Sequence, residues 1–163
     1  MEPVLPLTHP LTLVHVALSL IAILTGLVVA RGLLASQWMP RWTHWFLWTT
    51  VATTVTGFFF PFRGFTPAFG TGIVSTLVLV PTLFALYGRH MTGAWRWIFA
   101  VGAMISLYLN VFVLVAQLFL KVPALHALAP TQAEPPFAIA QGVVLVVFVV
   151  LTIFVVRRFH PVR

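Results

Sequence analysis

The chain has 163 residues, of which 61% are hydrophobic and 7% are charged, whereas about a quarter of the residues in a soluble domain are charged. Nine basic and two acidic residues cannot cover the surface of a soluble fold of this size. The composition excludes a soluble enzyme, a disordered chain and a nucleic-acid-binding protein, and it predicts an all-α integral membrane protein that has the lipid bilayer as its partner.

Apolar segments long enough to cross a bilayer follow one another along the whole chain. A helix that crosses about 30 Å of hydrocarbon needs about 20 apolar residues. We therefore predict one transmembrane domain over residues 1–163, a bundle of five helices. The five expected spans cover residues 11–34, 43–60, 72–88, 94–120 and 137–156. The first is expected to be a retained span because Glu2, and no basic residue, precedes it. The third is short and contains Pro81, so a re-entrant segment is the alternative there.

Basic residues fall unevenly on the two sides of these spans. One side has only Arg63 and Lys121. The other side has the seven remaining basic residues: Arg31, Arg41, Arg89, Arg96, Arg157, Arg158 and Arg163. By the positive-inside rule the arginine-rich side is cytoplasmic, which places the amino terminus outside and the carboxyl terminus inside. We expect the membrane to be a bacterial inner membrane, and the Pro-rich segment 121–136 to cap the outer end of the bundle.

Polar residues inside the spans indicate which helix faces point inward, because a polar side chain in hydrocarbon must find a partner. The fourth span has Ser106, Asn110, Gln117 and Lys121 at spacings of 4, 7 and 4, which puts them on one face of a helix. His15 on the first span is expected either among the headgroups or opposite this face.

Helix counting places most of these polar residues in the outer half of the membrane, so we predict a polar ligand pocket there. The alternative is a hydrogen-bonded network that only holds the helices together. The ligand-binding candidates are His15, Ser19, Arg63, Asn110, Gln117, Lys121 and Gln141.

Histidines suggest an alternative, a redox protein that carries haem b or uses quinone. His44 and His90 fall on the inner side, and His15 and His126 fall on the outer side. Two pairs are similar to the ligand arrangement of four-helix di-haem cytochromes b, although three of these histidines lie at or beyond span ends, and haem ligands lie within helices in those proteins. The chain has no cysteine for c-type haem or thiolate sites, and no ligand spacing predicts a metal site.

The sequence contains no nucleophile–base pair, no carboxylate pair and no phosphate-binding loop. We therefore expect a non-enzymatic protein, either an accessory subunit of a membrane complex or a small-ligand binder, with a protein partner or a second copy of the chain as its neighbour. An oligomeric channel or transporter is the third hypothesis, disfavoured because the spans contain no carboxylate and no repeat.

Overall fold

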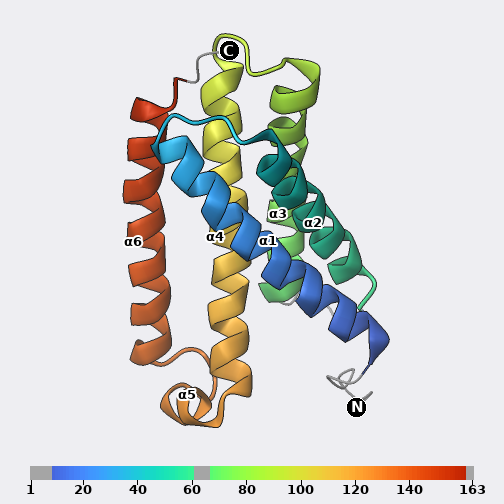
Figure 1. Ribbon diagram of the computed structural model, residues 1–163. Coiled ribbons are helices and arrows are strands. Elements are labelled where there is room, and N and C mark those ends of the chain that lie inside the picture. The colour runs from blue at the N-terminus through green and yellow to red at the C-terminus, as the bar shows by residue number, and fades with distance from the viewer. Residues whose placement is uncertain (1–8, 61–66, 161–163) are drawn as a thin grey trace.

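The structure is a computed structural model that describes residues 9–60 and 67–160, and all regular structure in these ranges is helical (Figure 1). The helices are α1 (Pro10–Leu34), α2 (Pro40–Phe58), α3 (Pro67–Leu83), the π-helical turn η1 (Phe84–Gly88), α4 (Trp95–Lys121), α5 (Pro123–Leu128) and α6 (Pro135–Arg158). Five of them begin with proline, which fits the first turn of a helix because the N–H that it lacks has no partner there.

Four helical segments are long and apolar enough to cross a membrane, which confirms a helical membrane protein. They are Pro10–Leu34, Phe69–Gly88, Trp95–Lys121 and Pro135–Arg158. The predicted third span is thus a continuous 20-residue apolar helix made of α3 and η1. The five-span count is not confirmed, because α2 has 19 residues but includes Arg41, His44 and six threonines.

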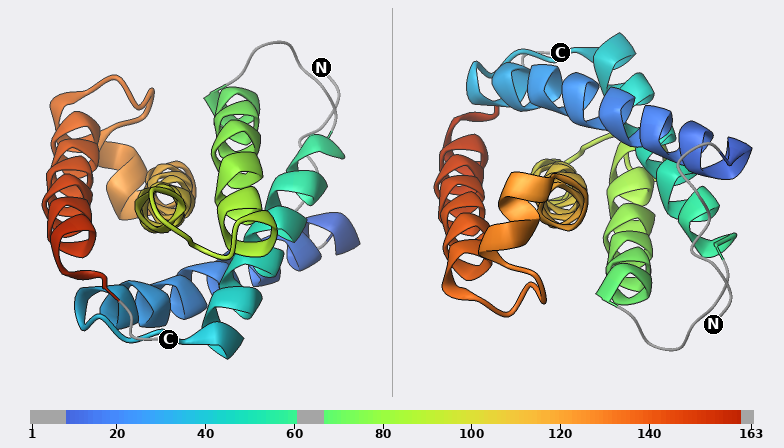
Figure 2. Two further views of the ribbon diagram at one scale, coloured as in Figure 1. Left: turned by 90° about the horizontal axis from the view of Figure 1, so that it is seen from above. Right: turned by 90° about the horizontal axis from the view of Figure 1, so that it is seen from below.

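The helices form two layers. Helices α3, α4 and α6 stand side by side with α4 in the middle, and α1 runs across one face of this row with α2 beside it (Figure 2). Helix α1 crosses α4 steeply, so that it contacts α6 near its carboxyl end and lies over α2 near its amino end (Figure 1).

One end of the bundle, here called the arginine end, carries the α1–α2 loop, the turn between η1 and α4, and the end of α6. The apolar core lies in this half of the bundle. Its members include Leu33, Phe46, Phe99, Met104 and Val155, all at most 2% exposed. In the other half, towards α5, no residue of α4 from 108 to 118 is buried. The bundle is therefore closely packed at the arginine end and less closely packed at the α5 end.

Two glycines allow the closest helix contacts in the packed half. A Cβ added to Gly26 of α1 would lie 2.6 Å from Leu107 Cδ1 and 2.9 Å from the Phe46 ring. A Cβ added to Gly102 of α4 would overlap the hydroxyl of Thr82 on α3. Small residues at these positions let α1 and α3 approach α4, as is common between helices in membranes.

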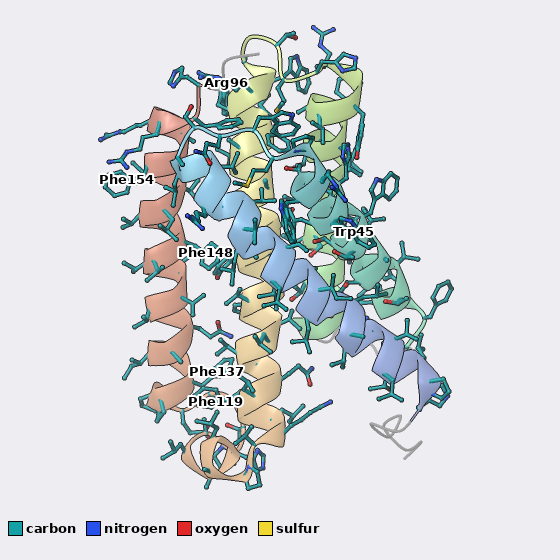
Figure 3. The ribbon with its side chains drawn as sticks, viewed as in Figure 1. Trp45, Arg96, Phe119, Phe137, Phe148 and Phe154 are labelled. Carbon is teal, nitrogen blue, oxygen red and sulfur yellow. The ribbon has the colours of Figure 1, made fainter. Side chains whose placement is uncertain are left out.

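The last turn of α6 is fastened to the rest of the arginine end by two long-range hydrogen bonds. Arg96 Nη1 donates to the carbonyl oxygen of Phe159 at 2.6 Å, between the ends of α4 and α6 (Figure 3). The backbone N–H of His160 donates to Ser36 Oγ at 2.8 Å. Both bonds satisfy polar groups where the helix runs out of its own partners.

Candidate functional site

Polar side chains of α1, α2 and α4 link these helices from the middle of the bundle towards the α5 end. Helices α2 and α4 run in the same direction here, so residues that follow one another along each helix lie progressively closer to the α5 end (Figure 1). The polar seam is defined by His15 of α1, by Thr50, Thr53 and Thr56 of α2, and by Ser106 and Asn110 of α4.

His15 forms the part of the seam nearest the α5 end. Its Nδ1 lies 2.9 Å from Thr56 Oγ1, and its ring meets the Phe60 ring edge-on with 5.2 Å between centroids. Thr56 gives its only hydroxyl proton to the backbone carbonyl of Ala52, at 2.8 Å. The network therefore assigns the imidazole proton to Nδ1, which donates to Thr56 and leaves Nε2 as an acceptor.

Of the two positions expected for His15, among the headgroups or opposite the polar face of α4, the contact with Thr56 does not match the second. The reason is the steep crossing of α1, which carries its amino-terminal turns over α2 instead of α4. Ser19, one turn further along, donates its hydroxyl to the His15 carbonyl at 2.7 Å and so satisfies itself within α1.

Asn110 and Thr50 join α4 to α2 in the middle of the seam. Asn110 Nδ2 donates to Thr50 Oγ1 at 3.2 Å, and the Thr50 hydroxyl donates in turn to the Phe46 carbonyl at 2.8 Å. Thr50 is 1% exposed, so this is a hydrogen bond in a low-dielectric interior, where an unpaired amide would be costly.

Two buried hydroxyls on either side of the Asn110–Thr50 pair have no hydrogen-bond partner in the described residues. They are Ser106 Oγ, one turn before Asn110, and Thr53 Oγ1, one turn after Thr50. Ser106 is 2% exposed. Other hydroxyls in the helices, such as that of Thr25, donate to a backbone carbonyl one turn back. This is the usual way for a Ser or Thr hydroxyl to be hydrogen-bonded in a membrane helix.

A second polar contact joins α4 to α6. Gln141 Nε2 donates to the Phe112 carbonyl at 3.0 Å, while its buried Oε1 has no partner in the described part of the chain. Nearer α5, Gln132 Nε2 donates to the Ala116 carbonyl at 2.7 Å. Phe119 and Phe137 close this contact with ring centroids 5.4 Å apart (Figure 3).

The loop before α6 is ordered around Glu134. Its Oε1 accepts hydrogen bonds from the hydroxyl and the backbone N–H of Thr131, at 2.8 and 3.2 Å. Desolvation acts to raise the pKa of the Glu134 carboxyl, but these bonds and the N–H of Ala133 favour the charged form and lower its pKa overall.

Two of the remaining predicted ligand residues lie away from the seam. Gln117 and Lys121 are exposed on the last turns of α4, and Arg63 falls outside the described residues. The predicted polar face of α4 thus divides into a buried part at Ser106, a half-buried part at Asn110 and an exposed part.

The predicted haem histidines other than His15 lie near the bundle ends. His44 stacks on Tyr87 with 5.7 Å between ring centroids. His90 is exposed in the turn before α4, and His126 is exposed on α5. The described residues contain no group of three His, Cys, Asp or Glu side chains that could hold a metal ion.

Sequence reasoning missed three residues that the structure places in polar contacts. Thr50 and Gln132 were not among the predicted site residues, and Arg96 was used only to orient the chain. Each contact depends on how two distant segments cross, and the sequence contains no signal for this geometry.

Comparisons of this chain with protein-family models, with curated proteins and with solved structures give no match.

Proposed function

We propose that the chain crosses a bacterial inner membrane five times, with α2 as the additional span and the arginine end in the cytoplasm. Support comes from the basic residues: six of the seven in the described part of the chain lie at the arginine end, and Lys121 lies at the end of α4. The positive-inside rule counts such residues. Exposed Trp42, Trp45 and Trp97 lie in the same half of the bundle, as Trp does at a membrane interface. The α5 end then faces outward.

In this topology we propose that the protein is a non-catalytic binder of a small lipid-soluble ligand, held at the polar seam in the outer half of the bundle. The observation that carries the proposal is the buried hydroxyl of Ser106, which has no hydrogen-bond partner in the described residues and lies one turn before Asn110 on α4. A buried hydroxyl without a partner costs about 1–3 kcal/mol, and a ligand that accepts its hydrogen bond removes this cost.

The chemistry of the seam indicates the ligand class. Ser106 and Thr53 have hydroxyl protons to donate, and His15 Nε2 has a lone pair to accept a proton donor. A quinone or quinol matches this set, because its carbonyls accept hydrogen bonds, its hydroxyls donate them and its ring is apolar. Haem b is the second candidate ligand, since an imidazole that donates through Nδ1 presents Nε2 to a metal.

Isothermal titration calorimetry of the detergent-purified protein with a short-chain ubiquinone analogue tests the ligand proposal, because it measures the binding affinity. Ser106→Ala is expected to weaken binding about three- to tenfold, the equivalent of one hydrogen bond. The matched control is Thr76→Ala, because Thr76 is exposed and bonds only to its own Gly72 carbonyl; we expect it to leave binding unchanged.

Ser106→Ala should not lower the thermal stability of the ligand-free protein, since the Ser106 hydroxyl has no partner among the described residues to lose. Absence of saturable binding by the wild type, or equal affinities of the two variants, would contradict the quinone proposal. An absorption spectrum of the same preparation, with a Soret band that is lost in His15→Ala, would assign haem instead.

The exposed apolar surface of α6 supports the proposal that this protein is a subunit of a larger membrane complex. Only 17% of the most apolar stretch of α6 is buried, the lowest share among the four candidate spans. Ile139, Val143 and Val146 on this helix are each more than half exposed. A second membrane protein that co-migrates with the wild type in blue-native electrophoresis would support this form, and migration only as a monomer would count against it.

A further inference from the structure

An apolar groove of about 220 Å³ runs between α3 and α4 near the arginine end. Its walls come from these two helices alone, with Leu77 and Pro81 on one side and Trp97, Val101 and Ile105 on the other. No residue of α1, α2 or α6 lines it, so the groove opens to the membrane and not into the bundle. None of the residues that line the groove belongs to the polar seam.

The length of the groove fits one leaflet of a bilayer. From Trp97 to Ile105 it follows α4 for eight residues, or about 12 Å at 1.5 Å per residue. Half of the hydrocarbon thickness is about 15 Å. An acyl chain of a lipid that starts at the headgroup level therefore fits the groove, whereas a transmembrane helix of a partner would cross the whole bilayer.

The turn that joins the two helices lining the groove contains a cation. Arg89 is exposed in the turn that joins η1 to α4, and its guanidinium lies 5.6 Å from the centre of the Trp95 ring. Glu134, the only acidic residue in the described part of the chain, lies at the opposite end of the bundle, before α6. Arg89 therefore has no carboxylate partner in the described residues, and its charge is available to a phosphate.

The exposed Trp97 gives the same end of the groove a lipid-facing group. It is 48% exposed and lines the groove in the first turns of α4, where an amphipathic ring sits well at the headgroup level. An apolar slot, an interfacial Trp and an unpaired Arg together match the two parts of a phospholipid. Basic pockets between transmembrane helices bind anionic headgroups for the same reason.

We propose that the α3–α4 groove is a binding site for an anionic phospholipid, with one acyl chain between Pro81 and Val101 and the headgroup phosphate at Arg89. Such a lipid would fill the gap between the two helices and neutralise the arginine. The proposal does not rest on the quinone proposal, because the two sites share no residue.

Native mass spectrometry of the purified full-length protein tests this site, with phosphatidylglycerol and phosphatidylcholine of identical acyl chains added in turn. The wild type is expected to retain phosphatidylglycerol preferentially. Arg89→Gln should reduce that preference about fivefold, the effect of one Arg near an anionic group. Arg41→Gln is the matched control, since it removes the same charge from the same end of the bundle, at the start of α2.

A second pair of variants tests the groove itself. Val101→Trp fills the slot and should remove the tightly bound lipid, whereas Val146→Trp places the same side chain on the exposed face of α6 and should not. Equal effects of Arg89→Gln and Arg41→Gln would overturn the proposal, because they would show a general attraction to the positive end. Full lipid retention in Val101→Trp, or its replacement by a second copy of the chain, would overturn it as well.

Discussion

Replacing Gly26 with alanine is expected to lower the stability of the folded protein by about 1–3 kcal/mol, the usual cost of overpacking a core. The added Cβ would lie 2.6 Å from Leu107 Cδ1 and 2.9 Å from the Phe46 ring. Both neighbours are 1% exposed, so neither can move without displacing the rest of the packed half. Helix α1 would have to shift away from α4.

Gly142→Ala is the matched control for this substitution. Gly142 lies in α6, where an added Cβ meets no atom within 4 Å, and alanine favours a helix over glycine by up to about 1 kcal/mol. Thermal unfolding in detergent should therefore show a lower midpoint for Gly26→Ala and an unchanged or higher midpoint for Gly142→Ala. Equal midpoints would mean that α1 does not pack against α4 at Gly26.

Replacing Arg96 with alanine is expected to free the last turn of α6 and to cost about 1.5–3 kcal/mol, the value of a hydrogen bond from a charged group. Its Nη1 is 2.6 Å from the Phe159 carbonyl, and the Phe159 side chain is 1% exposed. Without this donor the carbonyl is left unpaired, and the Phe159 ring is less firmly held against the core.

Hydrogen exchange is the measurement for this prediction, because it reports local opening of the segment around residues 155–160. Arg158→Ala provides the control: its guanidinium lies 5.4 Å from the centre of the exposed Phe154 ring and is not the donor to Phe159. We expect faster exchange in this segment for Arg96→Ala and little change for Arg158→Ala. Equal exchange in both variants would contradict the role of Arg96.

The helical segments could be predicted from sequence because apolar length and proline positions determine them. The predicted span 94–120 differs from α4 by one residue at each end, 137–156 lies within α6, and Pro40 starts α2 close to the predicted residue 43. Helix α2 fits the prediction of a membrane span least well. Its six threonines lower its hydropathy, but five of them donate their hydroxyls to a carbonyl one turn back, so they do not prevent a helix.

The contacts within the candidate site could not be predicted, because they depend on the crossing angles of the helices. Counting residues placed His15 and Asn110 at a similar depth, but it gave no means of knowing that α1 turns His15 towards Thr56. Asn110 pairs with Thr50 instead. Periodicity identifies the face of a helix, whereas the partner of that face depends on the whole bundle.

The proposed ligand site requires that the outer half of the bundle be accessible and that the arginine end be closed and cytoplasmic. Cysteine labelling in intact cells measures the accessibility of the outer half and the orientation of the arginine end in one experiment. The chain has no cysteine of its own, so each single-cysteine variant reports on one position. The four variants are Thr131→Cys in the loop before α6, Thr53→Cys in the polar seam, Ala103→Cys in the packed core and Thr92→Cys in the turn before α4.

A small membrane-impermeant thiol reagent added outside the cells should label the cysteines at 131 and 53 and leave those at 103 and 92 unlabelled. Labelling at 92 without labelling at 131 would show the opposite orientation. Labelling at 131 with a protected cysteine at 53 would show that the polar seam is as closed as the core, and this result would contradict a ligand site in the outer half.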